Sequence, residues 1–259
     1  MEACPLCLAP IRSLGTVTAQ RTKRQLPILE CVRCGSLFNH SGYREDERAQ
    51  RADATFLDGC FGSSFGYYSD LIRTTLRLRP EIRTHLDIGC GSGALLAAGE
   101  KNGLRSTGLD LNPFVIQVAQ RRQLDARCAP LEMNRGGATY DLVTCDQVLE
   151  HVEEPRGFLE MIASHVSDRG VVFLNAPFRP GTMLTKAYLK KQDAFGSPFF
   201  DNDVHINHFS REAMRTVVKD LVGASSVTPF YGARNRWSRR VMWAASFLSR
   251  TARGFLYVA

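Results

Sequence analysis

No stretch of the sequence is apolar for long enough to cross a bilayer. The longest apolar run near the C-terminus, residues 241–248, contains a serine and is far shorter than the roughly 20 residues of a membrane-spanning helix. The first five residues also lack the basic region and apolar stretch of a secretory signal. We therefore expect a cytoplasmic protein, whose 44% hydrophobic residues suffice for an ordinary globular core.

Acidic residues are missing from the last part of the chain. Residues 221–259 contain six arginines and no acid, so most of the net charge of +7 lies there. Such an end could contact nucleic acid, an anionic membrane or an acidic substrate, but a solvated surface is the simpler interpretation. Within it, residues 236–250 place Trp237, Val241 and Leu248 on one helical face. This pattern predicts a helix between the last two strands, with binding to a membrane surface as the alternative.

The eight cysteines include two Cys-x-x-Cys pairs near the N-terminus, formed by Cys4, Cys7, Cys31 and Cys34. Without a secretion signal, such pairs more often bind a metal than form disulfides. Four thiolates match the tetrahedral set of a structural Zn²⁺ site and leave no position open for a substrate. Residues 1–42 are therefore predicted to form a zinc ribbon, with strands near 26–31 and 36–38, whose fold the metal stabilises. The alternative is four unrelated thiols.

A glycine-rich turn joins an apolar segment to a helix-forming run. Gly89, Gly91 and Gly93 allow the backbone to bend sharply and to approach a ligand closely. About twenty residues later Asp110 ends a second apolar segment, where its carboxylate can accept hydrogen bonds from ribose hydroxyls. Asp87, before the turn, would repel a pyrophosphate but attract a cationic group. The pattern favours a nucleoside cofactor that carries a cation, and a dinucleotide is the alternative.

Residues 86–93, Leu-Asp-Ile-Gly-Cys-Gly-Ser-Gly, closely resemble the first motif of class I S-adenosylmethionine-dependent methyltransferases. The resemblance implies S-adenosylmethionine as the cofactor. Members of the family often hold the adenine amino group with an acid after the third strand, where this chain has Ala129 and Pro130. Backbone groups or Leu131 would then hold the adenine. The residues expected at the cofactor are Asp87, Gly89, Cys90, Gly91, Gly93, Asp110, Leu111, Leu131, Cys145 and Asp146.

From residue 85 onward, strand-like segments alternate with helix-like ones, which predicts a parallel sheet with helices on both faces. The resemblance implies the same α/β class: a Rossmann-like, seven-stranded, mostly parallel sheet preceded by the small zinc ribbon. Residues 43–64 are expected to form a linker or helix, and residues 65–259 the methyltransferase domain, with a lid insertion near 177–204. The predicted strands lie near 85–89, 105–110, 125–129, 140–145, 170–175, 225–231 and 253–259. The predicted helices lie near 70–78, 93–102, 113–122, 155–166 and 210–221.

A polar cluster follows the strand predicted at 140–145: Asp146, Gln147, Glu150 and His151. The run around Glu150 and His151 looks like the branch of the family that contains the ubiquinone-biosynthesis O-methyltransferases. In that branch an acid at the position of Gln147, with the counterparts of Glu150 and His151, can hold a divalent cation. An amide is a poorer ligand for a hard cation than a carboxylate, so we predict no catalytic metal. His151 is a candidate general base, unless it and Glu150 only hold the turn together.

Residues 204–210 resemble a stretch that precedes the last core helix of small-molecule methyltransferases. His205 and His208 in this stretch could each take a proton from a substrate hydroxyl or amine, with structural capping as the alternative. We therefore predict S-adenosylmethionine-dependent methyl transfer to a hydroxyl, amine or carbon of a small molecule. The candidate catalytic residues are His151, His205 and His208.

Two other functions fit parts of the sequence. An RNA methyltransferase would bind phosphates with the ribbon and the arginine-rich end. The ribbon has nearly balanced charge, however, and basic residues do not alternate with aromatic ones for base stacking. The third hypothesis is a non-catalytic scaffold that keeps the fold. No feature of the sequence defines an oligomeric state.

Overall fold

The computed structural model describes residues 3–19, 25–39, 54–134, 138–179, 185, 205–230 and 254–258. The chain forms two compact units. The first, the ribbon unit, combines Met1–Glu45, Gln147–Glu160 and Ala176–Leu221. The second, the sheet unit, combines Asp46–Asp146, Met161–Asn175 and Val222–Ala259. Each unit is therefore assembled from segments that are distant in the sequence.

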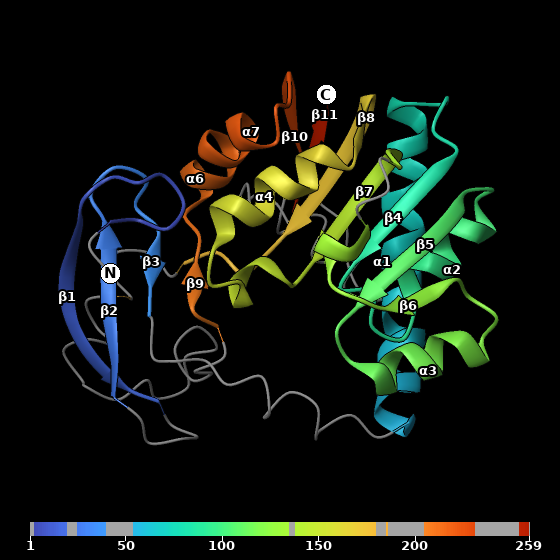
Figure 1. Ribbon diagram of the computed structural model, residues 1–259, viewed down its shortest axis with the longest axis horizontal. Helices are drawn as coiled ribbons and strands as arrows, with labels where there is room; N and C mark the ends of the chain where they lie inside the picture. The colour runs from blue at the N-terminus through green and yellow to red at the C-terminus, as the bar shows by residue number, and fades with distance from the viewer. Residues whose placement is uncertain are drawn as a thin grey trace. The chain divides into compact units, whose positions relative to one another are not determined.

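A seven-stranded sheet organises the sheet unit (Figure 1). Its strands are β4 (Thr84–Ile88), β5 (Arg105–Asp110), β6 (Ala126–Cys128), β7 (Tyr140–Asp146), β8 (Val166–Asn175), β10 (Ser226–Phe230) and β11 (Gly254–Val258). Their order across the sheet is β10-β11-β8-β7-β4-β5-β6. The strands from β8 to β6 are parallel, while β11 pairs antiparallel with both β8 and β10. This arrangement confirms the predicted Rossmann-like, mostly parallel sheet.

Helices flank the sheet, and they are α1 (Ala54–Leu78), α2 (Ala94–Lys101), α3 (Pro113–Arg121) and the last turn of α4 (Pro155–Ser164). Tyr67 and Leu71 of α1 share a buried cluster with Leu95 of α2 and with Leu142 and Phe173 of the sheet. Figure 1 shows α1 behind the sheet and the end of α4 in front of it. Both faces of the sheet are therefore covered, and the burial of these apolar side chains stabilises the unit.

Helix α1 is much longer than the segment 70–78 that the sequence predicts. It begins at Ala54 and continues through Gly59 and Gly62, although each glycine disfavours a helix by about 1 kcal/mol relative to alanine. A side chain added at either glycine would meet no atom within 4 Å, so packing does not require them. Because of these glycines the sequence pattern does not predict the first part of the helix. Burial of later residues such as Tyr67 offsets the unfavourable helix propensity of the glycines.

Short elements and boundaries also differ from the prediction. Strand β8 begins at Val166 rather than near 170, and the helix predicted at 210–221 divides at Thr216. The two resulting helices are α6 (Arg211–Arg215) and α7 (Val217–Leu221). Two 3₁₀ helices, η2 (Leu131–Asn134) and η3 (Leu149–His151), follow β6 and β7. Such one-turn elements carry no full apolar period that a sequence pattern could reveal.

The ribbon unit contains a four-stranded antiparallel sheet, in the order β1 (Ile11–Thr18), β2 (Gln25–Cys31), β3 (Leu37–Phe38) and β9 (Asn207–His208). Val17, Leu26, Ile28 and Leu37 form its buried core. Strands β2 and β3 confirm the two strands predicted in the ribbon. Strands β1 and β9 are additions that the sequence does not predict.

Strand β9 joins this sheet from a distant part of the sequence. Leu37 lies opposite His208, and Phe38 lies opposite Asn207. Figure 1 shows the short β9 beside β3. The segment that carries two of the candidate histidines therefore completes the sheet of the ribbon.

Several predicted features lie outside the described residues. They are residues 43–53 of the predicted linker, the helix at 236–250 and most of the insertion at 177–204. Within the described parts of the chain, no helix is both long and apolar enough to cross a membrane.

Candidate functional site

The four predicted zinc ligands converge in the ribbon unit: Cys4, Cys7, Cys31 and Cys34. Their sulfurs all lie within 4.8 Å of one another. The sulfurs of Cys4 and Cys34 are 3.8 Å apart. Those of Cys7 and Cys31 are 3.4 Å apart. Four thiolates bound to one Zn²⁺ at about 2.3 Å stand roughly 3.8 Å from one another, so this set fits a tetrahedral ion.

Backbone amides donate to two sulfurs of this cluster, and a neighbouring thiol favours the charged form of Cys34. The amides of Cys7 and Cys34 donate to the sulfurs three residues before them, at 3.4 and 3.3 Å. A hydrogen bond from the Cys4 thiol lowers the pKa of Cys34 to about 5. The hydrogen bond with Cys34, together with burial, raises the pKa of Cys4, and burial raises that of Cys7. Thiolate is the form of cysteine that binds a metal, so binding of zinc would displace the remaining thiol protons.

In the sheet unit, the glycine-rich turn after β4 adopts a backbone that other residues disfavour. Gly89, Gly91 and Gly93 have φ values of 75°, 52° and 88°. A Cβ on Gly93 would also lie 2.4 Å from Cδ1 of Leu124, so only glycine fits there. The amide of Gly89 donates to the carbonyl of Leu109 at 2.8 Å. This hydrogen bond ties the turn to the end of β5.

Asp110, the last residue of β5, also holds the turn. Its Oδ2 accepts a hydrogen bond from the backbone amide of Gly91, and its Oδ1 accepts one from the backbone amide of Asn112, both at 2.9 Å. Each carboxylate oxygen has a second lone pair, which leaves acceptor capacity for the ribose hydroxyls that the sequence analysis assigns to it. Asp110 thus links the glycine turn to the expected ligand position.

Parallel pairing brings three acids to one edge of the sheet. Asp87 lies opposite Gly108 of β5 and Thr144 of β7, and Asp110 and Asp146 end those two strands. Burial raises the pKa of Asp87 to about 8, and the charges of Asp146 and Asp110 raise it as well. The concentration of carboxyl groups makes this edge a favourable place for a cationic group.

A buried polar chain supports Asp87 from within the sheet. The hydroxyl of Thr144 donates to Oδ1 of Asp87 at 2.7 Å, and Nε2 of His85 lies 2.8 Å from the same hydroxyl oxygen. Burial lowers the pKa of His85 to about 3, so its imidazole is neutral. With the Thr144 proton committed to Asp87, Nε2–H of His85 is the donor to Thr144. The sequence pattern identifies neither supporting residue.

Asp146 has two partners of its own in the sheet unit. Its Oδ2 accepts a hydrogen bond from the hydroxyl of Tyr68 at 2.7 Å, and its Oδ1 accepts one from the side-chain amide of Asn175 at 2.5 Å. Tyr68 comes from α1 and Asn175 ends β8. The sequence analysis does not single out Asn175, because a lone amide at a strand end carries no pattern.

The other residues expected at the cofactor differ in exposure. Leu111 is 55% exposed, whereas Leu131, Cys90 and Cys145 are buried. Met133 of η2 is also largely exposed, although the sequence analysis does not select it. Exposed apolar side chains after β5 and β6 are suited to contact an aromatic ring such as adenine.

In the ribbon unit, Glu150 and His151 of η3 lie next to His205. Nε2 of His151 is 3.8 Å from Oε1 of Glu150, and the ring centroids of His151 and His205 are 4.7 Å apart. One ligand atom from each of the three residues lies within 4.8 Å of the others. A carboxylate with two imidazoles can relay a proton or hold a metal ion. The third member of the set is His205 and not Gln147, and the prediction of no catalytic metal stays a prediction.

Hydrogen bonds join η3 to the segment that carries His205. The amide of Ile206 donates to the carbonyl of Glu150 at 2.8 Å. The side-chain amide of Asn207 donates to the carbonyls of Leu149 and Val152, at 2.9 and 2.6 Å. Asn207 is fully buried, and it fixes the backbone on both sides of Glu150.

His208 occupies a different environment from His151 and His205. It is 1% exposed and lies in β9 opposite Leu37. Burial, with a smaller effect from the charge of His205, lowers its pKa to about 3. The structure therefore brings His151 and His205 together and places His208, as a neutral group, inside the ribbon unit.

A family model described as a methyltransferase domain matches residues 63–221. The match covers more than half of the chain. The chain belongs to this methyltransferase family. The matched range of the methyltransferase includes the glycine turn, the three acids and Glu150, His151 and His205, while the four clustered cysteines precede it.

Curated relatives of the methyltransferase align with its central part. The ubiquinone biosynthesis O-methyltransferase of Idiomarina loihiensis is 34% identical over 98 residues, which are 35% of this chain and 40% of the relative. The mitochondrial ubiquinone biosynthesis O-methyltransferase of Schizosaccharomyces pombe is 35% identical over 99 residues, 35% of this chain and 36% of the relative. The chain thus spans well under half the length of these relatives.

Solved structures share the fold of the methyltransferase at low sequence identity. A SAM-dependent methyltransferase from Archaeoglobus fulgidus is 18% identical with a TM-score of 0.54, over 80% of this chain and 99% of that chain. An O-methyltransferase family protein from Burkholderia thailandensis is 17% identical with a TM-score of 0.55. The match covers 83% of this chain and 62% of that chain. At these identities the likeness establishes the fold alone.

Proposed function

We propose that this methyltransferase transfers a methyl group from S-adenosylmethionine to a small molecule, and that the acceptor is an oxygen, amine or carbon, with oxygen favoured. The observation that carries the proposal is the acid-lined glycine turn. In it, Asp87, Asp110 and Asp146 adjoin the carboxyl edge of parallel strands. The names of the curated relatives, which are O-methyltransferases, support an oxygen acceptor.

In this proposal the sheet unit binds the cofactor. Asp110 accepts hydrogen bonds from the ribose hydroxyls, and Asp87, ionised on binding, balances the charge of the methionine ammonium. Gly89, Gly91 and Gly93, with Cys90, form the backbone cradle. The residues that complete the cofactor site are Leu111, Leu131, Cys145 and Asp146.

When bound, S-adenosylmethionine supplies a methyl group that is open to attack by a nucleophile. The protein contributes alignment of the two reactants, which can lower a barrier by several kcal/mol. Tyr68 and Asn175 hold the carboxylate of Asp146 in one orientation, so this edge of the site is ordered before a ligand arrives.

The second part of the proposal concerns the acceptor. A hydroxyl acceptor must lose a proton, and His151 or His205 is suited to take it. Glu150 would stabilise the imidazolium that forms next to it. The deep burial of His208 suits a structural role better than contact with substrate, so among the three candidate histidines we favour His151 and His205.

We also propose that Cys4, Cys7, Cys31 and Cys34 bind one structural Zn²⁺. The support is their spacing and the amide hydrogen bonds to sulfur. Reduced thiolates of this kind persist in a reducing compartment, which agrees with the cytoplasmic location expected from the sequence.

The first test is calorimetric titration with S-adenosylhomocysteine. Asp110→Asn should weaken binding by about 1–3 kcal/mol, because a neutral amide replaces a charged acceptor. The matched control is Asp125→Asn, which removes the same charge from an exposed ion pair with Arg127 and should leave binding unchanged. Absence of binding to the unaltered protein would sink the proposed function.

The acceptor class needs a separate test. Salt-sensitive retention of total RNA on filters would favour the RNA methyltransferase. Methylation of a panel of small hydroxylated and aminated compounds, without such retention, is the result that we expect.

A further inference from the structure

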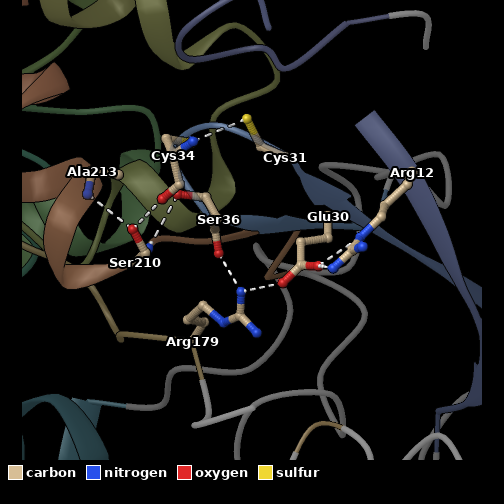
Figure 2. A network of polar contacts seen from close by, with 9 residues as sticks. Arg12, Glu30, Cys31, Cys34, Ser36, Arg179, Ser210 and Ala213 are labelled. Carbon is tan, nitrogen blue, oxygen red and sulfur yellow. Dashed lines mark hydrogen bonds and ion pairs between the residues drawn. The ribbon is translucent and has the colours of Figure 1, made fainter. Parts of the chain in front are cut away.

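Ribbon residues between Glu30 and Asn39 form hydrogen bonds with Arg179 and with the segment 205–210, which carries His205. All of these contacts lie within the ribbon unit. They form at three places, around Arg179, Ser210 and Asn39, and Figure 2 shows the first two.

The first contact is made by Arg179. Its guanidinium donates to Oε1 of Glu30 at 2.7 Å and to the carbonyl of Gly35. The side chains of Arg179 and Glu30 are each only 12% exposed, so solvent screens this pair little. The amide of Arg179 donates to the carbonyl of Phe209 at 2.8 Å. Arg179 therefore joins the ribbon to the residues directly after β9.

The second contact is made by Ser210, the N-cap of α6. Its hydroxyl oxygen accepts the amide of Ala213 at 2.9 Å, and its hydroxyl donates to the carbonyl of Cys34. Its amide donates to the hydroxyl of Ser36 at 3.1 Å. The start of α6 is thus attached to a cysteine of the cluster and to the serine two residues after it.

The third contact reaches His205 itself. The side-chain amide of Asn39 donates to the carbonyl of His205 at 3.0 Å, and the amide of Asn39 donates to the carbonyl of Ile206 at 2.9 Å. Ile206 in turn donates to Glu150, as described above. Asn39 is fully buried, so its hydrogen bonds are not replaced by water when they break. One continuous set of hydrogen bonds therefore runs from the ribbon to Glu150.

The backbone that makes these contacts depends on the cysteine cluster. Strand β3 has two residues, which are too few to hold a backbone by themselves. A zinc ion bound by Cys31 and Cys34 would fix the turn that leads into it, because metal binding in such small segments is coupled to folding. Loss of the metal should release Ser36 and Asn39 first.

We propose that the zinc ribbon is a positioning element for the acceptor side of the reaction, with Asn39 as the residue that positions His205. The inference rests on the proposed function, in which His205 and its neighbours act on the acceptor. Asn39 touches no reacting atom and acts through the backbone of His205 and Ile206. The ribbon would therefore control the rate of methyl transfer without contributing to cofactor binding.

The test compares two variants with the same chemical change. Asn39→Asp replaces the donor to His205 with an acceptor. Gln25→Glu makes the same amide-to-acid change at an exposed ribbon position, whose side chain donates to the hydroxyl of Thr18. Hydrogen exchange of the Ile206 amide should be about tenfold faster in Asn39→Asp and unchanged in Gln25→Glu. Removing zinc from the unaltered full-length protein with a chelator should accelerate the same amide. If Asn39→Asp does not fold, Ser36→Ala replaces it. This variant removes the hydroxyl that accepts the Ser210 amide and that also hydrogen-bonds to Cys34, so its zinc content is measured alongside.

Kinetics then separate positioning from a general loss of structure. In Asn39→Asp, kcat should fall about tenfold and the pH profile of kcat should shift, while zinc content and affinity for S-adenosylhomocysteine stay the same. Equal losses of cofactor affinity and kcat would contradict the proposal, as would unchanged exchange at Ile206 after zinc removal. Exchange is measured without methyl transfer, so failure of the proposed function, seen as absent cofactor binding, remains a separate result.

Discussion

The sheet unit and the ribbon unit assemble their candidate functional residues in different ways. In the sheet unit, Asp87, Gly89 and Asp110 stand in short runs at the ends of neighbouring parallel strands, so local sequence and sheet topology suffice to bring them together. In the ribbon unit, Glu150 and His205 come from distant segments that hydrogen bonds join to the ribbon. A short motif therefore reveals the first site, whereas the second becomes visible only in three dimensions.

The strongest test of this contrast is loss of the proposed zinc site. Cys31→Ser should unfold the ribbon strands, because zinc binding supplies about 10 kcal/mol or more in small structural sites. The sheet unit should still bind S-adenosylhomocysteine. Zinc analysis, circular dichroism and calorimetry check the three parts of this expectation. Cys128→Ser is the control, since Cys128 is exposed and outside the cluster, and equal damage by both variants would contradict it.

A smaller effect should follow from crowding the glycine turn. Gly93→Ala should destabilise the sheet unit by about 2–4 kcal/mol, through a left-handed backbone and a clash with Leu124. Gly103 has a similar φ of 84°, but a Cβ there meets no atom within 4 Å. Gly103→Ala should therefore lower stability by only about 1 kcal/mol. Chemical denaturation of both variants measures the difference, and equal losses would show that close packing plays no part.

The protonation of Asp87 should make cofactor affinity depend on pH. Its pKa of about 8 means that the free protein holds the carboxyl protonated near neutral pH, whereas a bound cation favours the ionised form. Affinity for S-adenosylmethionine should therefore rise, by up to about tenfold per pH unit, from about pH 6 toward pH 8. Calorimetry over this range measures the slope. Asp87→Asn should remove the dependence, and a slope that survives the substitution would assign the linkage to another group.

The smallest expected effect is a gain of stability in α1. Gly62→Ala should stabilise the sheet unit by about 0.5–1 kcal/mol, because alanine favours the helix and the site is open. Gly108→Ala is the contrast, since its Cβ would lie 2.6 Å from Cδ1 of Leu96 and should destabilise. Thermal unfolding of both variants shows whether each substitution raises or lowers the stability of the protein. A loss of stability in Gly62→Ala would indicate that α1 needs glycine for a reason other than helix packing.

The sequence predicts the fold class well because its signals are local. The alternation of strands and helices, the glycine turn and the proline at the start of α3 each report on neighbouring residues. Long α1 escapes prediction because Gly59 and Gly62 interrupt its pattern. Strand β9 escapes because two residues carry no alternation, and its partner is far away in the sequence.

The candidate site residues also differ in whether a local sequence signal predicts them. The sequence marks the four cysteines and the acids Asp87 and Asp110, since spacing alone identifies them. It does not mark Asn39, Asn207 or His85, which are buried polar residues whose function depends on partners from other segments. Nor does spacing separate His205 from His208, although one lies beside His151 and the other inside the ribbon unit.

Strand β9 has a consequence for how the chain is made. The edge of β3 stays unpaired during synthesis until residues near 207 leave the ribosome, because its partner lies in the second half of the sequence. Long-range pairings of this kind form late, and open strand edges invite contacts with other chains. If the cysteines bind zinc as proposed, early uptake of the metal would protect the nascent ribbon until β9 is made, and the metal supply would then affect the yield of folded protein.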